Sequence, residues 1–199
     1  MKLVNEKEIA SGSFVKLVQI DYADEVGVVR QYEAVKSPNR VRKVVDIIAI
    51  LRPSNELLLV RQYRPPVNAF VIEFPAGLVD EGETVTDAAI RELKEETGFT
   101  AMNVVDYGET ASSPGILEEV VSFVHLYIDE TDPINQNVVQ NLDEGESIEL
   151  FRFPLSKIIE PSYLKKLYNR EGSKVMTGSR VMSWMLGVFE ATQILKIVM

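Results

Sequence analysis

Two apolar runs separated by a short turn constrain the fold of this chain more than any other feature. Residues 44–51 are apolar except for Asp46, and residues 57–60 are apolar throughout. Near-continuous runs of this length predict strands that are buried on both faces of a sheet. The intervening residues 52–56 include Pro53 and Asn55 and predict the turn that joins the two strands.

A smaller pair of strands precedes these runs. Residues 14–20 and 29–35 partly alternate between apolar and polar side chains, which predicts a β-hairpin with Gly27 in its turn. The pattern changes just before residue 40. We therefore expect an N-terminal strand region over residues 1–40 and a main domain over residues 41–199.

Strands and helices are mixed in the main domain. Residues 120–128 predict a further strand, and residues 179–194 predict a helix with Ser179 as its N-cap. This mixture indicates an α/β domain. The apolar tail contains Glu190 and Lys196, whereas a membrane span needs ~20 nearly uncharged residues. We therefore expect a core helix there and no membrane partner.

Composition excludes several classes of protein. The formal net charge of −9 argues against an extended basic surface for nucleic acid, although it leaves room for a small phosphate ligand. The chain contains no cysteine, so disulfides and thiolate metal sites are excluded. The first residues lack the apolar core of a signal peptide, and we expect a cytoplasmic protein.

A predicted helix over residues 85–97 carries Glu92, Glu95 and Glu96 on one face. Three like charges at this spacing repel one another by a few tenths of a kcal/mol per pair. A divalent cation reverses that sign, because carboxylate oxygens are ligands that Mg²⁺ prefers. Taken alone, the three glutamates fit an ordinary solvated acidic face better than a metal site, because charged runs are usually solvated.

The complete spacing around the helix is more specific. Gly77 is followed after five residues by Glu83, and after seven more by Arg91-Glu92-Leu93-x-Glu95-Glu96-x-Gly98-Phe99. This arrangement resembles the signature box of the Nudix hydrolases. It departs from the family only at Phe99, where an aliphatic residue is more usual and where the side chain packs rather than reacts.

The resemblance implies the Nudix fold, an α/β/α sandwich around a mixed sheet. It also implies that Glu92, Glu95, Glu96 and the backbone carbonyl of Ala76 bind Mg²⁺, for which Mn²⁺ may substitute. Arg91 matches the residue that, with Glu83, orients the helix and its carboxylates.

The segments beside the box resemble the ADP-ribose and ADP-sugar pyrophosphatase branch. Residues 61–66 and 73–77 are similar to that branch, and Pro114 lies 16 residues past Gly98, as in ADP-ribose pyrophosphatases. Glu119 completes its Pro-Gly-x-x-x-Glu pattern. The resemblance spans roughly residues 14–155.

This branch implies a set of substrate contacts. Arg64 would bind the diphosphate, although a surface salt bridge is the alternative. Tyr32 would stack on adenine and Glu33 would accept hydrogen bonds from its edge, although an ordinary strand tyrosine is equally consistent with the sequence. Related enzymes are homodimers, so Tyr32 would serve the site of the neighbouring subunit. The expected substrate-binding residues are Tyr32, Glu33, Arg64, Glu73, Leu78, Pro114, Gly115 and Glu119.

The general base is expected on the acidic loop over residues 143–146. Glu146 is the closest match to the family pattern, with Glu144 as the alternative. The expected catalytic residues are Glu146, Glu92, Glu95, Glu96 and Arg91. The only histidine, His125, lies in a strand pattern, and we expect it to be structural.

The implied reaction is Mg²⁺-dependent hydrolysis of a nucleoside diphosphate sugar, with ADP-ribose giving AMP and ribose 5-phosphate. A GDP-sugar or another ADP-sugar is the alternative within the hydrolases. A non-catalytic Nudix domain that senses a nucleotide is an alternative from another class. An isomerase on the same fold uses a cysteine, which this chain lacks.

Overall fold

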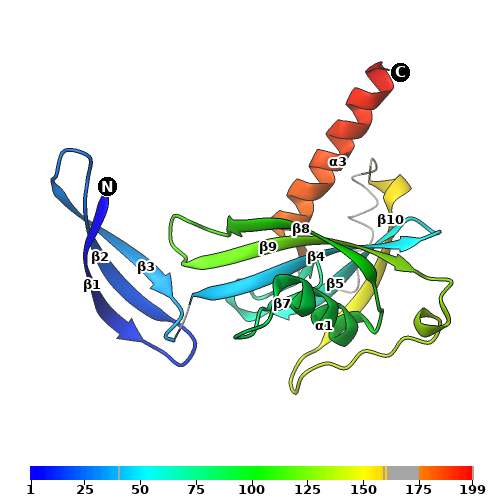
Figure 1. The fold of residues 1–199 in the computed structure, drawn as a ribbon, viewed down its shortest axis with the longest axis horizontal. Coiled ribbons are helices and arrows are strands. Elements are labelled where there is room, and N and C mark those ends of the chain that lie inside the picture. The colour runs from blue at the N-terminus through cyan, green and yellow to red at the C-terminus, as the bar shows by residue number, and fades with distance from the viewer. Residues whose placement is uncertain (40, 159, 161–174, 199) are drawn as a thin grey trace.

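The computed structural model describes residues 1–39, 41–158, 160 and 175–198. At positions 102 and 193–198 it describes only the backbone. Two sheets and two α-helices make up this part of the chain. A small sheet holds the N-terminal strands, and a mixed sheet carries one helix on each face (Figure 1).

The N-terminal residues form a three-stranded antiparallel sheet that stands beside the main body (Figure 1). Its strands, in spatial order, are β1 (Lys2–Ser11), β2 (Lys16–Ala23) and β3 (Val29–Lys36). The predicted hairpin is formed by β2 and β3, whereas β1 was not predicted. Only Val18 and Ala34 are buried apolar residues in these three strands.

The main sheet has the order β11-β6-β5-β4-β9-β8, with β10 paired to β5 and β7 paired to β4. Its strands are β4 (Arg42–Arg52), β5 (Glu56–Arg64), β6 (Ala69–Glu73), β7 (Ala76–Leu78), β8 (Met102–Ala111), β9 (Glu119–Asp129), β10 (Ile148–Pro154) and β11 (Val175–Thr177). The pairs β4–β9 and β6–β11 are parallel and the others are antiparallel. Short 3₁₀ turns occupy Pro65–Val67, Pro133–Asn135 and Leu155–Lys157.

Strand β4 explains why its apolar run is nearly continuous. Val45, Ile47, Ala49 and Leu51 pack into the cluster beneath α1 (Val85–Thr97). Ile48 and Ile50 point to the opposite face and pack into the cluster beneath α3 (Ser179–Val198). Successive side chains of a strand alternate between faces, so a sheet covered on both sides requires apolar residues at every position.

Helix α1 begins and ends where the sequence predicts. The hydroxyl of Thr84 accepts a hydrogen bond from the backbone N–H of Asp87 and donates one to its carboxylate, at 3.1 and 2.6 Å. At the other end Gly98 adopts a φ of 76°, which favours glycine, and its N–H donates to the carbonyl of Lys94.

Helix α3 corrects one prediction. Ser179 is the first helical residue, so Gly178 takes the N-cap position, and its carbonyl accepts from the N–H of Met182. Gly178 lies against β6, where a Cβ atom would be 3.2 Å from the carbonyl oxygen of Ile72. A larger residue at position 178 would require this neighbour to shift by a few tenths of an ångström. Because α3 begins at Ser179, this serine is not the N-cap.

The predicted core helix is only partly a core element. Val181 and Met185 are buried, whereas Met182 and Leu186 are exposed, and the helix extends away from the sheet (Figure 1). Among the helices of the described chain, none is long and apolar enough to cross a membrane.

Candidate active site

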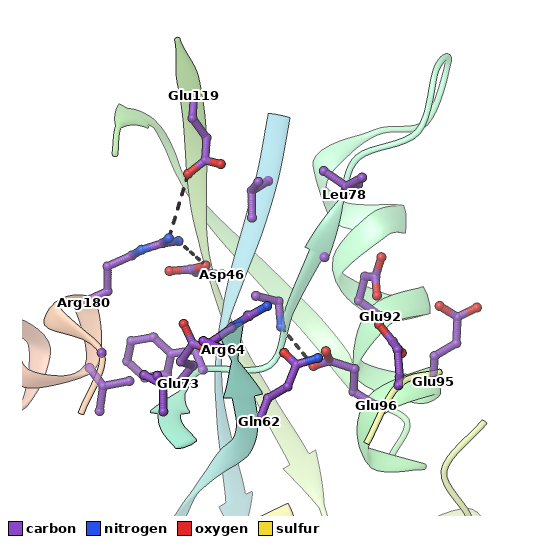
Figure 2. Close-up of a pocket in the computed structure, with 18 of the residues that line it drawn as sticks. Asp46, Gln62, Arg64, Glu73, Leu78, Glu92, Glu95, Glu96, Glu119 and Arg180 are labelled. Carbon is purple, nitrogen blue, oxygen red and sulfur yellow. Dashed lines mark hydrogen bonds and ion pairs between the residues drawn. The ribbon is translucent and has the colours of Figure 1, made fainter. Parts of the chain in front are cut away.

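A cavity of about 830 Å³ opens between α1, the strands β4 to β7 and the first turn of α3. Figure 2 shows the carboxylates of α1 on one side of it and Arg180 of α3 on the opposite side. The predicted site residues that line the cavity are Arg64, Glu73, Ala76, Leu78, Arg91, Glu92, Glu95, Glu96, Glu119 and Glu146. Tyr32, Glu33, Pro114 and Gly115 do not line it.

Arg91 connects the residues on the α1 side of the cavity, which we call the near wall; the side opposite, at Arg180, is the far wall. Its guanidinium donates to both carboxylate oxygens of Glu83, at 2.9 and 3.0 Å, and to the carbonyl of Leu78 at 2.9 Å. Its remaining nitrogen donates to Glu92 at 2.7 Å and to Glu95 at 3.0 Å. One arginine thus joins the loop before α1 to two of the carboxylates on the helix.

Glu92 lies directly over the backbone of β7. A Cβ atom added to Gly77 would lie only 1.9 Å from Cδ of Glu92, so the carboxylate occupies the space that any side chain at this position would fill. The first glycine of the box is therefore required for the position of Glu92 rather than for its own backbone angles.

Glu96 is the most buried carboxylate of the group, with 7% of its surface exposed. It accepts a hydrogen bond from the backbone N–H of Ala76 at 3.0 Å. Burial raises the pKa of Glu96 to about 8, and the charges of Glu92 and Glu146 act in the same direction. Burial also raises the pKa of Glu92, against the opposing effect of Arg91.

These residues fit a divalent cation. No group of three acidic or histidine side chains in the described part of the chain is arranged to hold an ion by itself. Mg²⁺ does not need such a cage, because it usually keeps several waters and takes one or two carboxylates plus substrate phosphates. Carboxylates whose mutual repulsion and burial raise their pKa values are stabilised in the charged form when a cation binds between them.

The raised pKa of Glu96 predicts that metal binding releases a proton. Without metal, Glu96 holds its proton at neutral pH, whereas a bound cation requires the ionised form. The apparent affinity for Mg²⁺ should rise as the pH rises towards about 8 and then level off. Isothermal titration calorimetry at pH 7 in two buffers with different ionisation enthalpies measures the released proton.

The Glu96→Gln variant is the control for this titration, because glutamine cannot ionise. A heat of binding that is independent of the buffer in the wild type would contradict the prediction.

The stability of the metal-free protein should depend on pH in the opposite direction to the affinity for Mg²⁺. The folded, metal-free protein keeps a proton that the unfolded chain has lost above pH 4.5, so its stability falls as the pH rises from there towards 8.

The far wall contains an ion pair that the sequence did not reveal. Arg180 donates to the buried carboxylate of Asp46 at 2.7 Å, and its other terminal nitrogen lies 4.0 Å from Glu119 (Figure 2). Arg42 lies 3.7 Å from the second oxygen of Glu119. The only signal in the sequence was Asp46 itself, the single charged residue in an apolar run.

This pair predicts a loss of stability when Arg180 is replaced. Burial raises the pKa of Asp46 and Arg180 opposes that shift, so Arg180→Met leaves a buried carboxylate that must take up a proton. We expect a loss of about 1–3 kcal/mol in urea unfolding at pH 7, and a larger loss at higher pH.

Two controls isolate the pair. Arg152 is similarly exposed but pairs with the surface carboxylates of Glu56 and Glu130, so Arg152→Met should cost less than about 1 kcal/mol. Adding Asp46→Asn to Arg180→Met should recover part of the loss. If both arginine variants unfolded at the same urea concentration, the buried pair would not be the cause.

Arg64 forms a salt bridge, the alternative that the sequence left open, and also lines the cavity in which a diphosphate would bind. It forms an ion pair with Glu73 at 2.7 Å, and both side chains line the cavity (Figure 2). About half of the Arg64 side chain is exposed, so the guanidinium is accessible to a ligand. Gln62, two residues earlier on β5, lines the cavity too and was not predicted.

The loop between Pro133–Asn135 and β10 contributes Asn141, Asp143 and Glu146 to the lining of the cavity. Glu146 lines the cavity together with Asp143 and Asn141, whereas Glu144 does not. Glu146 is exposed, and one of its carboxylate oxygens accepts from the N–H of Asp143 at 3.2 Å. This geometry favours Glu146 over Glu144 as the candidate general base.

The remaining predicted contacts lie together outside the cavity. The hydroxyl of Tyr32 donates to the carbonyl of Gly115 at 2.7 Å, and the backbone of Val35 pairs with Ile116 and Glu118. Strand β3 is thus joined to the segment that contains Pro114. His125 lies elsewhere, between the rings of Tyr107 and Tyr127, with centroid distances of 6.4 and 4.7 Å.

The sequence and the fold of this chain match those of known proteins. Residues 40–175, more than half of the chain, match the family model described as the NUDIX domain. The chain belongs to the Nudix family. This Nudix hydrolase is 35% identical over 190 residues to an uncharacterised Nudix hydrolase of Schizosaccharomyces pombe, covering 93% of this chain and 90% of that one.

Two further similarities refine the placement within the Nudix family. The ADP-ribose pyrophosphatase of Saccharomyces cerevisiae is 34% identical over 194 residues, covering 94% of this chain and 82% of its own. A crystal structure of an ADP compounds hydrolase matches with a TM-score of 0.69 and 26% identity, covering 96% of this chain and 94% of that one. The resemblance to the family, its fold and its ADP-ribose branch is confirmed.

Proposed function

We propose that this Nudix hydrolase cleaves the pyrophosphate bond of a nucleoside diphosphate sugar, with ADP-ribose as the substrate and Mg²⁺ as the cofactor. The observation that carries the proposal is that the α1 carboxylates and Arg64 face one cavity. Acidic side chains on one wall suit a cation, and the guanidinium suits the phosphates that the cation brings. The ADP-ribose pyrophosphatase among the relatives supports the choice of substrate.

The residues divide the work between binding and proton transfer. Two or three Mg²⁺ ions would be held by Glu92, Glu95, Glu96 and the carbonyl of Ala76. When bound, Mg²⁺ neutralises negative charge on the diphosphate and makes water more acidic. Arg64 would bind the diphosphate as a fixed cation.

Glu146 would accept a proton from the water that attacks phosphorus. The attack forms one P–O bond and breaks the bridging P–O bond of the diphosphate. ADP-ribose and water thus yield AMP and ribose 5-phosphate. Arg91 positions Glu92 and Glu95 throughout, because it contacts both side chains before any ligand binds.

The test is turnover by the purified protein. ADP-ribose, a second ADP-sugar, a GDP-sugar and free ADP are each incubated with Mg²⁺, and kcat/KM is measured for each one. We expect the highest value for ADP-ribose, with AMP as the nucleotide product. A higher value for the GDP-sugar would reassign the substrate within the same reaction.

A nucleotide sensor remains the alternative from another class. Such a domain would bind ADP-ribose without turning it over, and chelation by EDTA would leave binding unchanged. Turnover that EDTA abolishes and that Mg²⁺ or Mn²⁺ restores supports the enzyme. Binding without turnover at any metal concentration supports the sensor.

We also propose a cytoplasmic homodimer in which the N-terminal sheet contacts the partner. Two observations support the dimer: β1 is exposed along its whole length, and its sheet buries almost no apolar residue. A sheet of three strands normally needs an apolar face packed against something to be stable. In such a dimer Tyr32 and Glu33 would reach the partner's cavity. Sedimentation equilibrium of the protein with and without residues 1–40 tests the assembly.

A further inference from the structure

The loop that carries Glu146 is held against the end of α1. Between Pro133–Asn135 and β10 the chain has no helix or strand, and most of its residues are exposed. The N–H of Asn141 nevertheless donates to the carbonyl of Glu95 at 2.8 Å. The side-chain amide of Gln140 donates to the carbonyl of Glu96 at 2.6 Å.

These bonds use acceptors that the helix leaves free. The last four carbonyls of an α-helix have no partner within the helix, and Glu95 and Glu96 belong to the last turn of α1. Gln140 also donates to the carbonyl of Ile148, the first residue of β10, at 3.2 Å. The side-chain amide of Gln140 therefore connects the loop both to the last turn of α1 and to the first residue of β10.

The glycine that closes the box fits the same contact. A Cβ atom on Gly98 would lie 2.7 Å from both the backbone nitrogen and the carbonyl oxygen of Val139. Backbone atoms cannot move aside as the end of a flexible side chain can. The loop thus passes so close to the end of α1 that only glycine leaves room for it.

We propose that Gln140 is a positioning residue that fixes Glu146 relative to the carboxylates of α1. The proposal rests on the proposed function, in which Glu146 accepts a proton from water near those carboxylates. Gln140 touches neither the cavity nor the reacting atoms and acts through the loop. Because Glu146 is exposed on a loop without regular structure, the tether at Gln140 limits how far its carboxylate can move from Glu92 and Glu96.

Methionine at position 140 removes the donor and keeps the length of the side chain. In Gln140→Met we expect kcat to fall about 10- to 100-fold, since small displacements of a catalytic group have effects of this size. KM should stay within about twofold, because no substrate contact is lost. The matched control is Gln136→Met on the same loop. Gln136 donates to the carbonyl of Glu130, outside the cavity, and its loss should leave kcat unchanged.

A double-mutant cycle separates positioning from a general structural role. If Gln140 acts through Glu146, adding Gln140→Met to Glu146→Gln should not lower kcat any further. A fall of the same size in both backgrounds would overturn the proposal, because the amide would then stabilise something other than Glu146. A kcat for Gln140→Met equal to the wild-type value would overturn it as well.

Hydrogen exchange of the loop distinguishes this failure from failure of the proposed function. Amides in residues 137–147 should exchange faster in Gln140→Met than in the wild type, and the rest of the chain should be unchanged. Unchanged exchange in the loop overturns the tether, whatever the activity. A wild type that hydrolyses no diphosphate would refute the proposed function, and the exchange result would still decide whether Gln140 holds the loop.

Discussion

Replacing Glu96 by glutamine should lower kcat for diphosphate hydrolysis by at least about 100-fold, the effect expected when a charge that acts in a buried site is lost. Glutamine has nearly the same shape, and its carbonyl can still accept from the N–H of Ala76. What it lacks is the negative charge that a cation needs. Steady-state kinetics over a range of Mg²⁺ concentrations measure the change, and extra Mg²⁺ should not restore the rate.

The same substitution should not weaken the metal-free fold. Because burial raises the pKa of Glu96 to about 8, this side chain is mostly neutral at pH 7, as glutamine is. Unfolding in EDTA should therefore show equal or higher stability for the variant. Glu81→Gln is the matched control, since Glu81 is exposed in the loop before α1 and does not line the cavity. Wild-type activity in Glu96→Gln would remove the proposed metal site.

Gly77→Ala is expected to produce the second large effect without replacing any charged residue. The new methyl group would occupy the place of the Glu92 carboxylate, whose Cδ lies 1.9 Å from the built Cβ position. The backbone can stay in place because the atoms in the way are the end of a flexible side chain. We expect Glu92 to swing out of the cavity, and kcat and Mg²⁺ affinity each to fall by about 10- to 100-fold.

The control for this variant is Gly187→Ala on α3, where an added Cβ meets no atom within 4 Å. It should leave activity unchanged. The Gly77→Ala variant should unfold within about 1 kcal/mol of the wild type, which distinguishes a displaced carboxylate from a damaged fold. A fully active Gly77→Ala protein would show that the position of Glu92 does not matter for the reaction.

Local patterns predicted the elements whose causes are local. The limits of α1 followed from Thr84 and Gly98, whose capping contacts lie within one turn of the helix. The buried strands followed from apolar runs that any two-sided sheet requires. Strand β1 was missed because its side chains are exposed on both faces and show no apolar alternation. Ser179 was assigned as a cap because serine suits caps, but it is the first residue of the helix and Gly178 precedes it.

In the candidate site, too, local patterns predicted only the residues that lie close together in the sequence. The helical spacing predicted that Glu92, Glu95 and Glu96 share one face of α1, and all three line the cavity. The opposite wall depends on Arg180 meeting Asp46 across 134 residues of sequence, and no local pattern encodes such a contact. Tyr32 lies outside the cavity, where its hydroxyl donates to the carbonyl of Gly115, a contact between residues 83 positions apart that no local pattern encodes either.

The contact between Asp46 and Arg180 has a consequence for biosynthesis. Asp46 is on the first strand of the main sheet, and its counter-ion is among the last twenty residues of the chain. A ribosome thus translates the whole signature helix well before the residue that closes the opposite wall. Nascent or truncated chains that end before position 180 would carry every glutamate of the box. In these chains the carboxylate of Asp46 would lack its counter-ion, and the side of the cavity opposite α1 would be open.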